Sequence, residues 1–167
     1  MSSAVLGLGA NLGDALAALQ GAVDALGGTQ GITVVCSSAV FATEPVGGPE
    51  QPTYFNAVVL IETRLAPVQL LERVNEIEAQ WHRTREIRWG PRTLDIDIIS
   101  FGDVVSTDER LTLPHPRAAE RGFVLVPWLD ADADAELLGV PVRTLVQLVD
   151  ISGVQQLDPP AILQVPA

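Results

Sequence analysis

Apolar residues in the first part of the chain follow a strand pattern and then a helix pattern. An apolar run at residues 4–9 predicts a strand. The next apolar positions recur every three or four residues, which predicts a helix that ends at Gly27-Gly28. The apolar positions of this helix are Leu16, Leu19, Val23 and Leu26.

Two further strands and a second helix are predicted before residue 83. Residues 32–42 and 54–63 are rich in β-branched residues, as strands are. Residues 43–52 hold three prolines and two glycines and predict an irregular loop. Pro67 suits the first turn of a helix. The buried stripe of that helix is predicted to be Leu70, Leu71, Val74 and Ile77.

An arginine-rich loop that begins at Arg83 leads into a fourth predicted strand at residues 93–101. The order of elements is therefore β-α-β-β-α-β. This order predicts an α+β fold with a ferredoxin-like core, in which helices pack on an antiparallel sheet. We expect a single domain over residues 1–167, with its core at about 4–130 and residues 131–167 as a C-terminal extension.

The C-terminal part gives weaker signals. A short hairpin is expected through Val104-Val105, a short helix near 117–121 and another at about 144–149, and the tail from Asp158 should be irregular. The acidic run at 130–136 is interpreted as a solvated loop or helix start without an assigned function.

Charge and composition narrow the class of function. The formal net charge is −11 and the chain has no lysine, which argues against nucleic-acid or anionic-membrane binding. No apolar run approaches the length of a membrane span. The one cysteine, Cys36, lies in an apolar stretch and rules out an internal disulfide, so a cytoplasmic location is expected.

Four arginines and only one acidic residue lie within residues 83–93. The arginines are Arg83, Arg85, Arg88 and Arg92. A cationic patch in an acidic protein indicates a single anionic ligand, although a solvated, ion-paired loop would give the same pattern.

Asp95 and Asp97 are separated by one residue in the fourth predicted strand. Side chains alternate along a strand, so both carboxylates should lie on one face, roughly 7 Å apart. A pair of this kind can hold Mg²⁺ between them. The alternative is an ordinary strand with acids on its wet side, but the adjacent arginines favour phosphoryl transfer, which needs both metals and cations.

A second group of candidate residues surrounds the loop at 43–52. Tyr54 and Asn56 share a face of the third predicted strand. A ring beside an amide suits a flat heterocycle with donor and acceptor edges. The alternative is that Tyr54 covers the loop and Asn56 satisfies a turn. Further along, His115 lies between two prolines, which predicts a rigid extended loop and a ligand contact.

Several motifs resemble the 6-hydroxymethyl-7,8-dihydropterin pyrophosphokinase family, in that family's order. They are Gly-Ala-Asn-Leu-Gly-Asp at 9–14, Thr43-x-Pro45-x-Gly47, Gln51-Pro52-x-Tyr54-Phe55-Asn56, Arg-Trp-Gly-Pro-Arg-Thr-Leu-Asp-Ile-Asp at 88–97, and Leu113-Pro114-His115-Pro116. The resemblance implies transfer of the β,γ-pyrophosphoryl group of ATP to the pterin hydroxymethyl, with release of AMP, in folate biosynthesis. It also implies a monomer that takes small-molecule substrates.

The resemblance also implies roles for individual residues. Catalysis would rest on Arg83, Arg92 and Asp97, with two Mg²⁺ ions held by Asp95 and Asp97. The implied pterin contacts are Thr43, Glu44, Pro45, Val46, Tyr54, Asn56, Trp89 and Phe123. The implied ATP contacts are Asn75, Glu78, Arg85, Trp89, Arg92, Ile98, Arg110, Thr112, His115 and Arg121.

The chain departs from the family pattern at His82, where relatives often have glycine, at Glu44, and at Pro116, where relatives have an aromatic residue. Two other functions are compatible with the residues alone. One is a ferredoxin-like module that binds a nucleotide or metal without catalysis, since fold does not fix function. The other is an ordinary kinase that transfers the γ-phosphate.

Overall fold

The structure is a computed structural model that describes residues 1–11, 14–43, 53–85 and 94–166, with side chains of residues 82–85 excluded. In chain order, the elements are β1 Ser2–Asn11, α1 Ala15–Gly27, β2 Ile32–Ser37, β3 Phe41–Thr43, β4 Tyr54–Thr63, α2 Pro67–Arg85, β5 Leu94–Phe101, β6 Ser106–Asp108, β7 Leu111–Leu113, η1 Ala118–Glu120, α3 Gly122–Ala131, β8 Glu136–Leu137, β9 Val140–Pro141, α4 Val142–Val146 and β10 Val154–Gln156.

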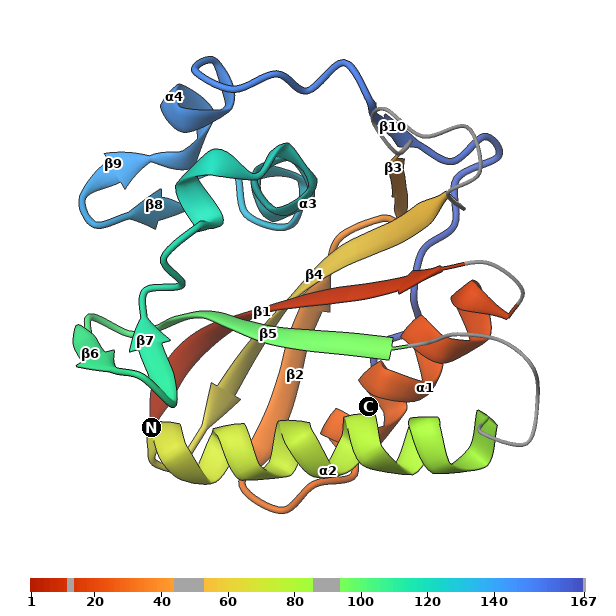
Figure 1. Ribbon diagram of the computed structural model, residues 1–167, viewed down its shortest axis with the longest axis vertical. Helices are drawn as coiled ribbons and strands as arrows, with labels where there is room; N and C mark the ends of the chain where they lie inside the picture. Colours follow the sequence, from red (N-terminus) through yellow and green to blue (C-terminus); the bar gives the residue numbers. More distant parts are fainter. Residues whose placement is uncertain (12–13, 44–52, 86–93, 167) are drawn as a thin grey trace.

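The main sheet is antiparallel, with β1 between β4 and β5. On its other edge, β4 pairs with both β2 and β3, and β10 extends the sheet beyond β3. The helices α1 and α2 connect strands that are not neighbours in the sheet (Figure 1). This is the predicted ferredoxin-like βαββαβ arrangement.

The prediction of one continuous strand at 32–42 is wrong, because the segment breaks between β2 and β3. At the break, the buried Ser38 Oγ accepts a hydrogen bond from the backbone N–H of Val58 at 2.9 Å. The next backbone N–H, that of Ala39, donates to Asp130 Oδ2 at 2.9 Å. Side chains therefore replace part of the ladder, and no local propensity signals this.

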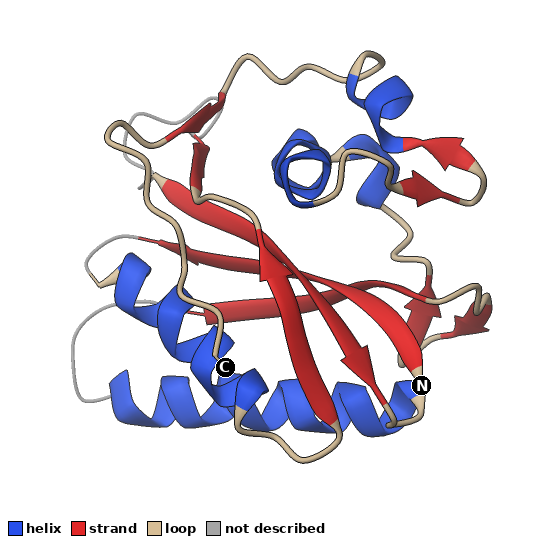
Figure 2. Cartoon of the chain, turned by 180° about the vertical axis from the view of Figure 1, so that it is seen from behind, coloured by secondary structure: helices blue, strands red, loops and turns tan. Residues whose placement is uncertain are grey.

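One face of the sheet is covered by α1 and α2, which lie side by side beneath it (Figures 1 and 2). The apolar positions predicted for the sheet and both helices meet in this core. Leu6, Leu8, Val59, Ile61 and Leu94 are at most 1% exposed. Leu16 is an exception to the predicted stripe, since it is exposed.

The second helix extends to Arg85, so the prediction of a loop from Arg83 is wrong. No glycine or proline interrupts residues 68–89, and most of these residues favour helix. Arg83 and Arg85 therefore belong to the last turn of α2, whose side chains lie outside the described part.

The opposite face of the sheet is covered only over part of its area, by α3, and α4 packs on α3 (Figure 1). Helix α3 was not predicted, and only a short helix was expected at 117–121, where the 3₁₀ helix η1 lies. The sequence of α3, Gly-Phe-Val-Leu-Val-Pro-Trp-Leu-Asp-Ala, is apolar around nearly its whole circumference. It therefore has no helical alternation to detect.

Three other expectations need adjustment. The β6–β7 hairpin begins just after Val104-Val105, and α4 begins at Val142 rather than at 144. The acidic run ends α3 and leads into β8 instead of starting a helix. In the part of the chain that the structure describes, none of the helices combines the length and the apolar character needed to cross a membrane.

Candidate active site

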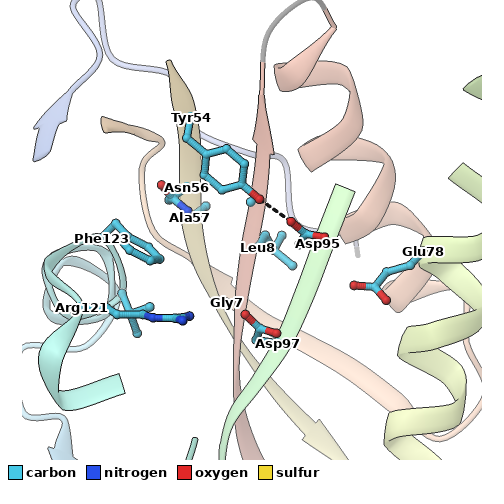
Figure 3. Close-up of a pocket in the computed structure, with 12 residues that line it drawn as sticks. Gly7, Leu8, Tyr54, Asn56, Ala57, Glu78, Asp95, Asp97, Arg121 and Phe123 are labelled. Carbon is cyan, nitrogen blue, oxygen red and sulfur yellow. Dashed lines mark hydrogen bonds between the residues drawn. The ribbon is translucent and has the colours of Figure 1, made fainter. Parts of the chain in front are cut away.

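The uncovered half of the second sheet face forms the floor of a cleft of about 340 Å³ (Figure 3). Where this face carries Val5, Val58, Leu60 and Ile99, α3 and its neighbours pack on it. Where it carries glycine and polar residues, it stays open. The lining residues are Gly7, Leu8, Gly9, Tyr54, Asn56, Ala57, Glu78, Asp95, Asp97, Arg121, Phe123 and Val124.

Asp95 and Asp97 lie on the cleft face of β5, as the alternation predicted. Both are exposed, whereas Leu94, Ile96 and Ile98 point to the core and are at most 4% exposed. Across the sheet, each aspartate has a glycine of β1 as its neighbour, Gly9 beside Asp95 and Gly7 beside Asp97. Because glycine has no side chain, no β1 side chain stands beside either carboxylate, and the Tyr54 ring occupies the space over Gly9.

Tyr54 spans the cleft floor from β4 to β5. Its hydroxyl donates a hydrogen bond to Asp95 Oδ2 at 2.5 Å (Figure 3). Its ring lies against Gly9, where an added Cβ would be 2.5 Å from Tyr54 Cε2. Gly7-Leu8-Gly9 is not the end of the strand, which continues to Asn11. It lies within β1, and a side chain makes the close approach at Gly9.

Asn56 is buried, with 5% of its surface exposed, and it points into the cleft from the same strand face as Tyr54. The Thr43 hydroxyl on β3 donates to Asn56 Oδ1 at 3.0 Å. This hydrogen bond fixes the orientation of the amide. The predicted pairing of a ring and an amide on one strand face is therefore present.

The wall opposite Tyr54 comes from the start of α3. Phe123 and Arg121 both line the cleft, and the Arg121 guanidinium carbon lies 5.5 Å from the centre of the Phe123 ring. Asn56 lies between Phe123 and Tyr54 in Figure 3. Two aromatic rings and one amide thus border a slot whose far end holds the aspartate pair.

Glu78 reaches the cleft from α2. Its Oε2 accepts a hydrogen bond from the backbone N–H of Ile96 at 2.7 Å, on the outer edge of β5. Burial raises the pKa of the Glu78 carboxyl, this hydrogen bond works in the opposite direction, and the charges of Asp95 and Asp97 raise it further. The cleft therefore concentrates negative charge on one side, which favours a ligand that brings cations.

The chain matches the model of the 7,8-dihydro-6-hydroxymethylpterin-pyrophosphokinase family over residues 5–133. A 2-amino-4-hydroxy-6-hydroxymethyldihydropteridine pyrophosphokinase of Methylorubrum extorquens is 45% identical over 95% of this chain and 100% of its own length. The enzyme of the same name from Mycobacterium leprae is 46% identical over 82% of this chain and 75% of its own.

The chain belongs to this family. It is therefore a pyrophosphokinase of folate biosynthesis that acts on hydroxymethyldihydropterin. Among solved structures, the Plasmodium falciparum HPPK-DHPS S436F/A437G/A613T triple mutant with pteroate aligns with a TM-score of 0.70 at 15% identity. That alignment covers 87% of this chain and 43% of the longer Plasmodium chain, and it shows the shared fold.

Seven of the residues that the family resemblance singled out line the cleft of this pyrophosphokinase. They are Tyr54, Asn56, Glu78, Asp95, Asp97, Arg121 and Phe123. Sequence reasoning missed Gly7, Leu8, Gly9, Ala57 and Val124 as lining residues. The spacing of Gly7 and Gly9 by two within a strand was a usable signal, because it removes side chains from a single face.

His115 lies beside the cleft, close enough to Asp97 and Arg121 for their charges to act on it. Burial lowers its pKa, the Asp97 carboxylate raises it, and Arg121 and Arg117 lower it. The residue begins a tight turn, since its carbonyl accepts from the N–H of Ala118, so the predicted extended loop is wrong. Its own N–H donates to Ile99 O at 2.8 Å.

Several other implied residues that the structure describes do not line the cleft. The Ile98 side chain is buried in the core on the opposite sheet face, so only its backbone could meet a ligand. Arg110 and Asn75 are exposed on the hairpin and on α2, and Thr112 is half-buried on β7. The residues Glu44, Pro45, Val46, Trp89 and Arg92 lie outside the described part of the chain.

Proposed function

We propose that this pyrophosphokinase binds its pterin in the slot between Tyr54 and Phe123 and carries out transfer at Asp95 and Asp97. The observation that carries the proposal is that the aromatic slot ends at the aspartate pair on one open sheet face. A flat heterocycle held there would place a substituent on its edge next to the carboxylates. Asn56 would read the heterocycle edge with its fixed amide.

Two Mg²⁺ ions are proposed at Asp95 and Asp97. The donor set fits, because Mg²⁺ takes one or two carboxylates and completes its coordination with phosphate oxygens and water. Over the described ranges, no three acidic, histidine or cysteine side chains cluster as a complete metal site. The remaining ligands would therefore come from ATP and water. Bound there, the metal would screen the phosphate charge and favour attack by the hydroxymethyl oxygen.

In the proposed reaction, the pterin hydroxymethyl oxygen forms a bond to the β-phosphorus of ATP. The bond from that phosphorus to the oxygen shared with the α-phosphate breaks, so AMP leaves, and the hydroxymethyl oxygen gives up its proton to water. Arg121 would offset charge on the transferred group from the α3 side, and Arg83, in the last turn of α2, and Arg92 would do the same. ATP is proposed to contact eight further groups. They are Asn75, Glu78, Arg85, Trp89, the Ile98 backbone, Arg110, Thr112 and His115.

The test of this function is incubation with ATP, Mg²⁺ and hydroxymethyldihydropterin, followed by separation of the nucleotides. We expect AMP and the pterin diphosphate to form in equal amounts. Release of ADP instead of AMP would indicate an ordinary kinase, and ATP binding without turnover would indicate a non-catalytic module. Either result would contradict the proposed pyrophosphoryl transfer.

Two variants test the assignment of roles. Asp97→Ala should lose about 100-fold or more in kcat, because it removes a metal ligand from the transition state. At saturating Mg²⁺, Tyr54→Ala should mainly raise the KM for the pterin, since it removes one wall of the slot. Equal and mild losses of kcat in both variants would contradict these roles.

We also propose that the enzyme acts as a cytoplasmic monomer that binds no nucleic acid. The net charge of −11 supports the last point, because polyphosphate backbones bind cationic surfaces. Sedimentation at micromolar concentration should give a single species of 17.8 kDa. A dimer in that experiment would contradict the monomer.

A further inference from the structure

The hydrogen bond between Tyr54 and Asp95 joins two parts of the cleft that the proposed function treats separately. The Tyr54 ring is one wall of the heterocycle slot, and Asp95 is one of the two carboxylates at its end. The bond crosses β1, because Tyr54 comes from β4 and Asp95 from β5. One side chain therefore contacts both subsites.

Gly9 makes this contact possible. It is paired with Asn56 of β4 on one side and with Asp95 of β5 on the other. A Cβ on Gly9 would lie 2.5 Å from Tyr54 Cε2 and 2.8 Å from the Tyr54 hydroxyl oxygen. No side chain fits beneath the ring, so the ring can reach Asp95 only above a glycine.

The hydrogen bond constrains the carboxylate of an exposed residue. Asp95 faces solvent, and a side chain in that position samples several rotamers unless a partner holds it. A donor on Oδ2 fixes the plane of the carboxylate and leaves Oδ1 directed elsewhere. Partners that hold a metal ligand from behind raise metal affinity, and their loss typically lowers it about 10- to 100-fold.

We propose that Tyr54 is a positioning residue for the metal subsite, in addition to its contact with the pterin. Its hydroxyl holds Asp95 in the orientation that accepts a divalent cation, and its ring lines the pterin slot. This inference rests on the proposed function in placing a cation at Asp95. It adds that one side chain serves both subsites, with its ring lining the pterin slot and its hydroxyl holding the cation ligand.

The variant Tyr54→Phe keeps the ring and removes only the hydroxyl. With α,β-methylene-ATP present, Mn²⁺ binding followed by electron paramagnetic resonance should weaken about 10-fold. At saturating Mn²⁺, the Kd for hydroxymethyldihydropterin should stay within about twofold of wild type, because the ring is retained. The matched control is Phe123→Leu, which should weaken pterin binding and leave Mn²⁺ affinity within about twofold.

A second variant breaks the same hydrogen bond without altering Tyr54. In Gly9→Ala, the new methyl group must displace the ring, so Mn²⁺ affinity should fall in the same direction as in Tyr54→Phe. Because both changes remove one interaction, the double variant should bind Mn²⁺ as Tyr54→Phe does, within about twofold. Fully additive losses would show that the two changes act separately and would overturn the proposal.

Three other results would also overturn it. One is Mn²⁺ affinity in Tyr54→Phe within twofold of wild type. Another is an equal loss of Mn²⁺ and pterin affinity in that variant, which indicates a general disturbance of the cleft. The third is an Asp95→Asn variant whose Mn²⁺ affinity equals that of the wild type. None of these measurements needs turnover, so failure of the AMP assay and failure of this inference are separate outcomes.

Discussion

Asp95 and Asp97 look equivalent in the sequence, but their surroundings in the folded protein differ. Asp95 accepts the Tyr54 hydroxyl, whereas the charge of Asp97 acts on His115. Both neighbours come from segments distant in sequence. The shared strand face could be predicted from alternation, because it depends only on local backbone geometry. The different partners could not, because they depend on which strands meet.

The pKa of His115 gives a prediction at this scale. Burial holds it below the ordinary value of 6.5, and the Asp97 carboxylate partly offsets this. In Asp97→Asn, the charge that raises the pKa of His115 is removed, whereas burial and the charges of Arg121 and Arg117 still lower it. The pKa of His115 should therefore fall further. Proton NMR titration of the imidazole measures this, with His82 as the second histidine signal. A higher His115 pKa in Asp97→Asn would contradict the assignment.

The same pKa fixes the sign of a stability effect. Below pH 6.5, the unfolded chain binds a proton at His115 more readily than the folded protein does. The contribution of neutral His115 to stability is therefore complete above pH 6.5 and is lost as the pH falls toward the folded-state pKa. Denaturant titrations of wild type and His115→Gln should differ in this window, with wild type showing the steeper decline toward low pH.

At the scale of elements, pattern and structure agree where a segment is amphipathic and disagree where it is not. The bounds of β4 match the predicted 54–63, and α1 ends at the predicted Gly27. Helix α3 has no polar face and was missed. The break between β2 and β3 was also missed, because Ser38 and Asp130 create it through hydrogen bonds that exist only in the folded chain.

A substitution at Ser38 tests whether its hydroxyl stabilises the break between β2 and β3. Its hydroxyl accepts from the buried N–H of Val58 and donates to Ala39 O. Ser38→Ala leaves the N–H of Val58 without that acceptor and should reduce the free energy of unfolding by about 1–3 kcal/mol. Urea denaturation measures this. The control Ser37→Ala, which removes a half-buried hydroxyl bonded to Ser38 O, should cost less. Equal costs would contradict the role given to Ser38.

At the scale of the molecule, the cleft exists because one face of the sheet is only partly covered. The first face is closed by α1 and α2. On the second, α3 stops short of the polar half, and its N-terminal end provides the N-cap residue Arg121 and Phe123. The register between β1 and β5 shifts between Val5 and Leu6, and Ile99, the residue of β5 at this shift, accepts the N–H of His115 at its carbonyl oxygen.

Leu125 tests whether the packing of α3 controls the pterin slot. It is fully buried between α3 and the sheet, two residues after Phe123. Leu125→Ala should lower the free energy of unfolding by about 2–5 kcal/mol and raise the KM for the pterin. The control Leu26→Ala, fully buried on the opposite face, should cost similar stability without changing that KM below the unfolding temperature. Equal KM changes in both variants would contradict the proposed coupling.

The sequence by itself determined the strands and helices of the core, the common face of Asp95 and Asp97, the common face of Tyr54 and Asn56, and, through its motifs, the family. These properties follow from local periodicity and from short-range spacing. Only the tertiary structure decided that Gly7 and Gly9 lie beside the two aspartates, that α3 supplies the opposite wall, and that the Tyr54 hydroxyl reaches Asp95. These features depend on strand register and on how layers pack, which are set by contacts between residues distant in the chain.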